Sequence, residues 1–271
     1  MSIDVEGFKQ GQKAMWAMGD YPDLARWIEA VGELVAERVG AAPGEELLDV
    51  ATGSGNVAVP AAARGARVTG LDITPELLEV ARARAAQAGL EITWIEGDAE
   101  QLPFPDGSFD RVSSCFGVIF APRQDHAARE LVRVARPGAT IALTAWTPEG
   151  LNGQMFKTMG AHMPPPPEGL RSPILWGSED HVRELFSGSG VELTFERHMI
   201  DFKHDSPESW VQYNERVLGP TIMAKNALEP QGKWEPLREE LLGLYRANNQ
   251  AQDGSLHVSA EYLLTVARKA D

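Results

Sequence analysis

The chain has 271 residues, with 39 acidic and 25 basic side chains and a formal net charge of −14 at pH 7. This balance argues against a general nucleic-acid binder, because phosphate contacts require clustered Lys and Arg. Cys115 is the only cysteine, which excludes an intramolecular disulfide and a cysteine zinc site.

Membrane insertion and export are not indicated by the sequence. No apolar run reaches the length that spans a bilayer, and Met1–Gln10 lacks the charged and apolar regions of a signal peptide. We therefore expect a cytoplasmic protein without a membrane span. The length suits one α/β domain with a small additional cap.

Residues 1–42 have a helical pattern, with apolar side chains from Ile28 to Val39 at helical spacing and a break at Pro43. Trp16 and Tyr21 flank a turn ahead of this helix. Two interpretations stay open: an arm packed on the core, or a lid that brings Tyr21 over a ligand.

Glu46–Ala58 predicts a buried strand, a turn of small residues and the start of a helix that reaches about Arg64. The turn holds Gly53 and Gly55, which accept backbone angles that side chains forbid. The next strand, Arg67–Leu71, ends at Asp72, 19 residues after Gly53. An acid at this distance is placed to accept the ribose hydroxyls of an adenosine, so the sequence predicts an adenosine site.

The type of adenosine cofactor is indicated by Asp49, at the end of the first strand. Its negative charge would repel a pyrophosphate but suits an ammonium and a sulfonium. The stretch Asp49–Asn56 resembles the first motif of the class I S-adenosylmethionine-dependent methyltransferases, roughly D/E-x-G-x-G-x-G. Ala51 occupies the first of the three glycine positions of that pattern, and Asn56 follows the last.

A helix from Thr74 to about Ala88 and a strand over Glu91–Ile95 lead to a second match, the stretch GDAEQLPF at 97–104. In the methyltransferase superfamily this stretch places its aspartate against adenine. The resemblance implies that Asp98 accepts from the exocyclic amine, while the next N–H, of Ala99, can donate to a ring nitrogen.

Phe109–Ser114 predicts the fourth strand, and Cys115 and Phe116 follow at its carboxyl end, beside the expected ligand crevice. We expect both residues near the cofactor. A nucleophilic role for Cys115 is not indicated, because no base lies near it in the sequence. A helix over Asp125–Ala135 and a strand over Ala139–Trp146 come next. The stretch 130–138 is again typical of this family.

Residues 148–190 are loosely patterned and contain the run Pro164–Pro167, which no helix or strand can cross. We interpret them as a cap over the sheet that binds the methyl acceptor. Val191–Lys203 predicts a long strand, residues 206–248 predict helices with a break at Gly219-Pro220, and Val258–Lys269 predicts a closing strand.

The expected fold is a Rossmann-like, seven-stranded, mostly parallel sheet with helices on both faces and an antiparallel strand at the edge. We divide the chain into an N-terminal arm or lid (1–42), an S-adenosylmethionine-binding core (43–147), the cap (148–190) and C-terminal elements that complete the sheet (191–271). Specific motifs cover most of residues 44–147, and the remainder follows the family by topology.

The function predicted on this resemblance is methyl transfer from S-adenosyl-L-methionine to a small-molecule acceptor, with the acceptor atom (O, N or C) open and no metal. The chain resembles most the ubiquinone/menaquinone-biosynthesis-type enzymes and their secondary-metabolism relatives. If the reaction needs a base, His126 and His162 are the candidates. The predicted cofactor-binding residues are Tyr21, Asp49, Ala51, Thr52, Gly53, Gly55, Asp72, Ile73, Asp98, Ala99, Glu100, Cys115 and Phe116. We expect a monomer or homodimer.

Two alternatives remain open. A nicotinamide-dependent reductase would tolerate the glycine turn and Asp72, but no tyrosine here has a lysine four residues later, as in short-chain dehydrogenases. A non-catalytic S-adenosylmethionine-binding protein is the other, because cofactor motifs do not prove turnover.

Overall fold

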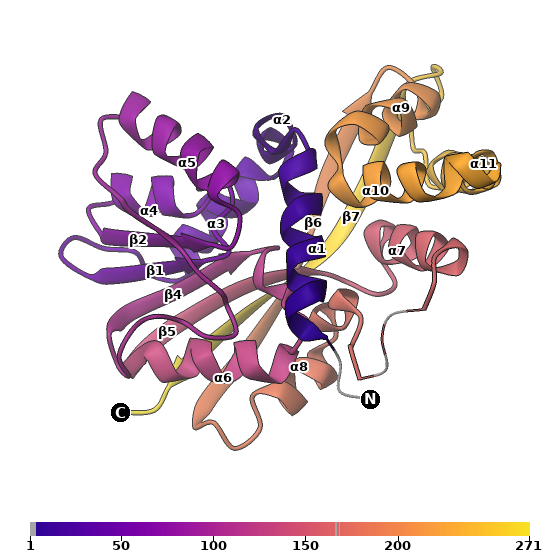
Figure 1. The fold of residues 1–271 in the computed structure, drawn as a ribbon. Coiled ribbons are helices and arrows are strands. Elements are labelled where there is room, and N and C mark those ends of the chain that lie inside the picture. Colours follow the sequence, from indigo (N-terminus) through magenta and orange to yellow (C-terminus); the bar gives the residue numbers. More distant parts are fainter. Residues whose placement is uncertain (1–3, 166, 168) are drawn as a thin grey trace.

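A computed structural model describes residues 4–165, 167 and 169–271. Its centre is a seven-stranded sheet in the order β3-β2-β1-β4-β5-β7-β6 (Figure 1). The strands are β1 (Glu46–Val50), β2 (Arg67–Asp72), β3 (Thr93–Glu96), β4 (Phe109–Cys115), β5 (Ala135–Trp146), β6 (Val191–His204) and β7 (Leu256–Lys269). The predicted fold class, a mostly parallel Rossmann-like sheet, is confirmed.

The last two strands differ in direction from each other. β7 pairs antiparallel with β5 on one side and with β6 on the other. The antiparallel strand therefore lies between β5 and the edge strand β6. Burial explains the order: the middle of β7 is fully covered at Leu263 and Leu264, whereas β6 alternates between exposed and partly buried residues as an edge strand does.

Helices cover both faces of the sheet. Figure 1 shows α4 (Ala58–Ala63) and α5 (Pro75–Gln87) on one side, and α6 (Gln124–Val134) and α8 (Glu179–Leu185) on the other. The central strands between them are largely buried; Leu47, Leu48 and Val50 of β1 are fully buried. This is the pattern that a parallel sheet covered on both faces requires.

α3 (Glu29–Arg38) packs beside α4 on the same face of the sheet, against β4 and β5. The other helices gather beyond the carboxyl ends of the strands. α1 (Val5–Met18) crosses that edge of the sheet, with α2 (Tyr21–Ala25) after it (Figure 1). α7 (Leu151–His162), α9 (Pro207–Val217), α10 (Gly219–Leu228) and α11 (Trp234–Ala247) form a helical group on the far side of α1. None of the helices in the described part of the chain is long and apolar enough to cross a membrane.

Several predicted boundaries move. The turn of small residues extends to Val57. β5 begins at Ala135, four residues early, because Ala135 pairs with Phe109 of β4; the register then shifts, and pairing resumes at Thr140 with Arg111. The predicted cap contains α7 and α8. Within its proline run, residue 166 lies outside the described residues, as does 168 beyond it. The break at Gly219-Pro220 is the first turn of α10, where a proline is tolerated.

Candidate functional site

A cavity, the chamber, opens at the carboxyl ends of β1, β2 and β4 and runs beneath α1 into the helical group. Its strand-end half is built by the turn after β1, the ends of β2 and β4, and residues 98–99. Its helical half is built by α7, α9 and α11 with β6. Of the sequence-predicted cofactor residues, those that line the chamber are Tyr21, Asp49, Ala51, Thr52, Gly53, Asp72, Ile73, Asp98, Ala99, Cys115 and Phe116.

Asp72 holds the glycine turn in place. Its Oδ2 accepts from the backbone N–H of Gly53 at 2.8 Å, and its Oδ1 accepts from the N–H of Thr74 at 2.9 Å. Burial raises the pKa of Asp72, although these backbone N–H groups oppose the shift. Each carboxylate oxygen can accept a further hydrogen bond. A Cβ at Gly53 would meet no atom within 4 Å, so the turn faces open space.

Asp49 is a second buried carboxylate, with 1% of its surface exposed. Thr52 Oγ1 donates to one of its oxygens at 2.6 Å, and Ser113 Oγ donates to the other at 2.8 Å. Burial raises the pKa of Asp49 to about 6 despite these hydroxyls. The carboxyl group therefore changes charge near neutral pH and favours a cationic ligand in its charged form.

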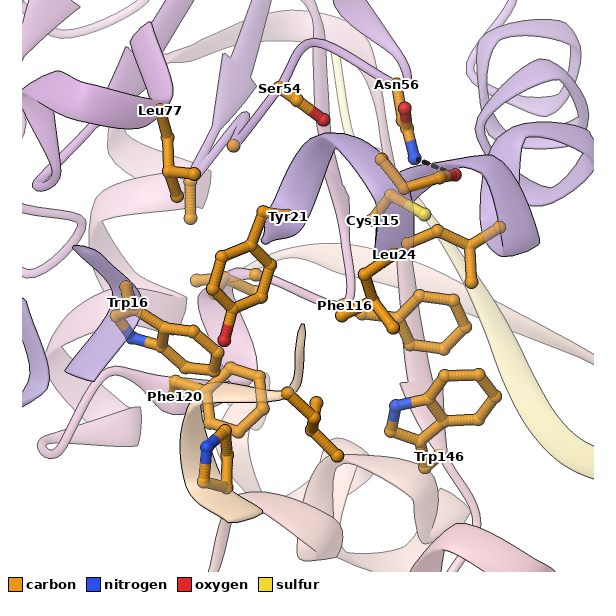
Figure 2. Close-up of a pocket in the computed structure, with 18 of the residues that line it drawn as sticks. Trp16, Tyr21, Leu24, Ser54, Asn56, Leu77, Cys115, Phe116, Phe120 and Trp146 are labelled. Atoms are coloured by element: carbon orange, nitrogen blue, oxygen red, sulfur yellow. Dashed lines mark hydrogen bonds between the residues drawn. The ribbon is translucent and has the colours of Figure 1, made fainter. Parts of the chain in front are cut away.

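Two residues of the chamber wall that are not glycine have left-handed backbone angles. Ala51 has φ of 51° and Phe116 has φ of 54°. Phe116 is held by its N–H, which donates to Thr144 Oγ1, and by its ring, which stacks on Trp146 at 3.9 Å between centroids. Such strain persists where the surroundings impose it, often at functional sites. Here it turns the Phe116 ring toward the chamber (Figure 2).

Asp98 is bonded to the N-terminal helix. Lys9 of α1, only 4% exposed, places its Nζ 2.5 Å from Asp98 Oδ2 and 2.5 Å from Glu100 Oε2. Glu100 lies behind the wall and not on it: its carboxylate also accepts from the N–H and Nε of Arg123. The predicted contact of Glu100 with a ligand is therefore replaced by an ion pair that fixes α1 to the core.

Gly55 also lies outside the lining. Its φ of 83° requires glycine, and an added Cβ would approach Trp94 at 3.2 Å. Gly55 therefore shapes the turn without lining the chamber. Asn56, the next residue in the chain, does line the chamber. Its side chain donates to the backbone oxygen of Ala25 at 3.1 Å and accepts from Arg84 at 2.6 Å. Asn56 thereby connects the turn to the end of α2 and to α5.

The structure places neither predicted base in the chamber. His126 is on an outer part of α6 next to Asp125, and His162 bonds Glu240 at 3.0 Å at the end of α7. The expectation was wrong in position because closeness in sequence to a strand end does not fix the direction of a helical side chain. Cys115 does line the chamber, but burial raises the pKa of its thiol to about 12, so a thiolate is disfavoured.

Aromatic side chains that sequence reasoning did not assemble enclose the middle of the chamber. Figure 2 shows Trp16, Tyr21 and Phe120 on one side and the stacked Phe116 and Trp146 on the other. Trp16 meets Phe120 and Tyr21 edge-on at 4.6 and 5.5 Å. Further in, the helical half adds Trp27, Phe202, Trp210 and Tyr245. The available signal was the aromatic content of residues 16–27 and 202–213.

Comparison with known proteins agrees with this geometry. A family model described as "Methyltransferase domain" matches residues 48–143. The uncharacterized protein Rv1403c of Mycobacterium tuberculosis is 40% identical over 260 residues, covering 95% of this chain and 93% of its own.

Two further likenesses concern the core and the fold. The demethylmenaquinone methyltransferase of Thermus thermophilus is 38% identical over 136 residues, 49% of this chain and 60% of the relative. The crystal structure of the YcgJ protein of Bacillus superposes with a TM-score of 0.62 at 19% identity, covering 88% of this chain and 97% of that one. The last likeness shows the fold alone.

Proposed function

Because the chain belongs to the class I S-adenosylmethionine-dependent methyltransferase family, we propose that it methylates a small, apolar, ring-bearing molecule bound in the helical half of the chamber. The protein is an enzyme of this family, and its cofactor is S-adenosyl-L-methionine. The acceptor, the roles of individual residues and the division of the chain into parts are proposals.

The strand-end half fits the adenosyl part of the cofactor. Each carboxylate oxygen of Asp72 can accept one further hydrogen bond, which suffices for two ribose hydroxyls. The adjacent turn faces open space at Gly53. Asp98 and the N–H of Ala99 suit the amine and a ring nitrogen of adenine. We assign these three contacts to the cofactor.

Asp49 suits the cationic end of the cofactor. Its buried carboxylate adjoins Ala51 and Thr52 on the chamber wall, where an ammonium group would balance its charge. Tyr21 closes this region from the side of α2, with its hydroxyl oxygen accepting from the N–H of Gly219. We therefore propose that residues 1–42 act as the lid, bringing Tyr21 over the site.

When bound, the cofactor supplies a methyl group on a sulfonium that is open to attack by an acceptor. The protein's part is to align the acceptor and exclude water, which lowers the barrier through entropy already lost on binding. The walls made by Phe116 and Trp146 are flat and apolar, and no imidazole lines the chamber within the described part of the chain. We propose that these walls orient a flat acceptor.

The acceptor region differs in detail from the cap expected at 148–190. α7 contributes Leu151, Met155 and Phe156 to the chamber, whereas Trp210 and Tyr245 come from α9 and α11 in the C-terminal region. We propose that both regions form the acceptor pocket together. The Thermus thermophilus relative is a demethylmenaquinone methyltransferase, which supports a ring-bearing acceptor.

The observation that carries the proposal is the continuity of one chamber from the Asp72–Gly53 turn to the aromatic helical half. The test is incubation with S-adenosylmethionine labelled in its methyl group and a panel of phenols, quinols and indoles. We expect label in at least one acceptor and equal formation of S-adenosylhomocysteine. Cofactor binding without any product across ring-bearing acceptors would contradict the proposal and favour a non-catalytic binding protein.

A further inference from the structure

Two side chains on α9 line the helical half of the chamber. Trp210 and Asn214 are four residues apart, so they share one face of the helix. Trp210 is 4% exposed and Asn214 is 5% exposed, and both line the chamber. The Nε1 of Trp210 is fully covered by protein atoms, so Trp210 presents its ring and not its N–H to the chamber.

Asn214 has an open carboxamide. Its backbone carbonyl accepts from Leu218, but among the described residues its side chain neither donates to nor accepts from any group. The carboxamide keeps some exposed surface although the residue is 95% buried. Because Asn214 lines the chamber, we infer that this exposed surface faces the chamber. A buried amide that lacks a partner costs free energy, and a ligand that supplies one recovers it.

The surroundings hold both side chains in place. The Trp210 ring packs against Trp27 and Phe202, each at 5.4 Å between centroids, and against Tyr245 at 6.3 Å. The Tyr245 hydroxyl donates to the sulfur of Met155 at 3.4 Å. A capping box at Ser206 fixes the start of α9. The Asn214 carboxamide is thus presented from a rigid element, as a specific polar contact requires.

The helical half carries no charge. The charged side chains that line the chamber, as far as the chain is described, are Lys9, Asp49, Asp72 and Asp98, and all four are in the strand-end half. An ionised group in the helical half would be buried without a counter-charge, which is costly. A neutral molecule with one polar atom fits this half better than an acid or an amine.

We propose that Asn214 binds an oxygen atom of an uncharged, flat, apolar acceptor and thereby sets acceptor specificity. Its carboxamide NH₂ is a donor suited to a carbonyl or hydroxyl oxygen. The aromatic walls receive the remainder of the molecule. This inference rests on the proposed function, since it assigns the helical half to the acceptor.

The experiment is calorimetric titration of the protein, saturated with S-adenosylhomocysteine, with three probes of one size: 2-naphthol, naphthalene and 2-naphthoate. We expect 2-naphthol to bind about tenfold more tightly than naphthalene, because only it supplies an oxygen. The 2-naphthoate anion should bind more weakly than 2-naphthol. Equal binding of 2-naphthol and naphthalene, or strongest binding of 2-naphthoate, would overturn the inference.

Variants locate the effect. Asn214→Leu should abolish the preference for 2-naphthol, because it removes the donor. Gln212→Leu is the matched control, because Gln212 is an exposed amide on the same helix and does not line the chamber; it should retain the full preference. A full preference in Asn214→Leu would contradict the assignment.

The titration with S-adenosylhomocysteine that precedes each probe separates this inference from the proposed function. If the parent protein does not bind S-adenosylhomocysteine, the proposed function fails. If every variant binds it with parental affinity but the probes do not discriminate, the inference on Asn214 fails while the proposed function stands. Parental cofactor affinity also shows that Asn214→Leu is folded.

Discussion

The backbone N–H of Gly53 donates to Oδ2 of Asp72 across 2.8 Å, although the two residues are 19 positions apart. This bond joins the turn after β1 to the end of β2, two parallel neighbours whose registers pair Val50 with Leu71. The glycine turn and the acid are therefore one preformed unit. A cofactor that occupies it finds the carboxylate already oriented.

Replacing Asp72 tests this unit. Asp72→Asn should weaken binding of S-adenosylmethionine by roughly 1–3 kcal/mol, because a neutral amide accepts fewer and weaker hydrogen bonds than a carboxylate. Calorimetry measures the affinity, and urea denaturation checks that the variant is folded. Parental affinity in a folded Asp72→Asn protein would remove Asp72 from the ribose contact.

The charge of Asp49 predicts how cofactor binding depends on pH. Burial raises its pKa to about 6, and an adjacent ammonium would lower that pKa again. Cofactor binding below this pH must then release a proton, so affinity weakens as the pH falls. For S-adenosylhomocysteine we expect constant affinity above pH 7 and a loss of up to roughly tenfold per unit below pH 6. Asp49→Asn should bind more weakly and lack this dependence; an identical pH profile in the variant would refute the assignment.

Two residues of the turn, Ala51 and Asn56, predict opposite outcomes when each is replaced by glycine. Ala51 has a left-handed backbone angle, φ of 51°, so Ala51→Gly should raise the free energy of unfolding by about 0.5–1 kcal/mol. Asn56 has no such angle but bonds Ala25 and Arg84, so Asn56→Gly should lower it by roughly 1–2 kcal/mol. Urea denaturation of both variants measures the difference, and a shift of the same sign in both would show that these contacts are not the cause.

Lys9 and Lys13 form a second matched pair, four residues apart on α1. Lys9 is buried between Asp98 and Glu100, so Lys9→Met removes one of the two cations that face the buried Glu100 and the cation that pairs with the partly buried Asp98, and should cost about 2 kcal/mol. Lys13 pairs with the exposed Glu96, so Lys13→Met should cost less than about 1 kcal/mol. Denaturation curves compare them, and similar losses in both variants would count against a buried role for Lys9.

The parts of the site that follow directly from a strand end were predictable from sequence. A short apolar run fixes β1, the glycines fix the turn after it, and parallel pairing brings Asp72 to the same edge. Asp98, Cys115 and Phe116 follow by the same rule, since β3 and β4 end at that edge. Local pattern and sheet topology are sufficient there.

The remainder depends on contacts that no local pattern encodes. Glu100 points away from the chamber because Arg123, 23 residues later, and Lys9, far earlier, supply its counter-charges. The helical half combines residues from α7, α9 and α11, whose packing is set by long-range burial. Trp210 and Asn214 have helical spacing, but the direction of that face emerges only when the helices pack together.

The most direct test of the central claim is parallel calorimetric titration of the protein with S-adenosylmethionine, S-adenosylhomocysteine and NADPH. We predict that the first two bind, that both weaken in Asp72→Asn, and that NADPH does not bind. Binding of NADPH without either sulfur compound would contradict the account, because the Gly53–Asp72 unit would then serve a nicotinamide cofactor.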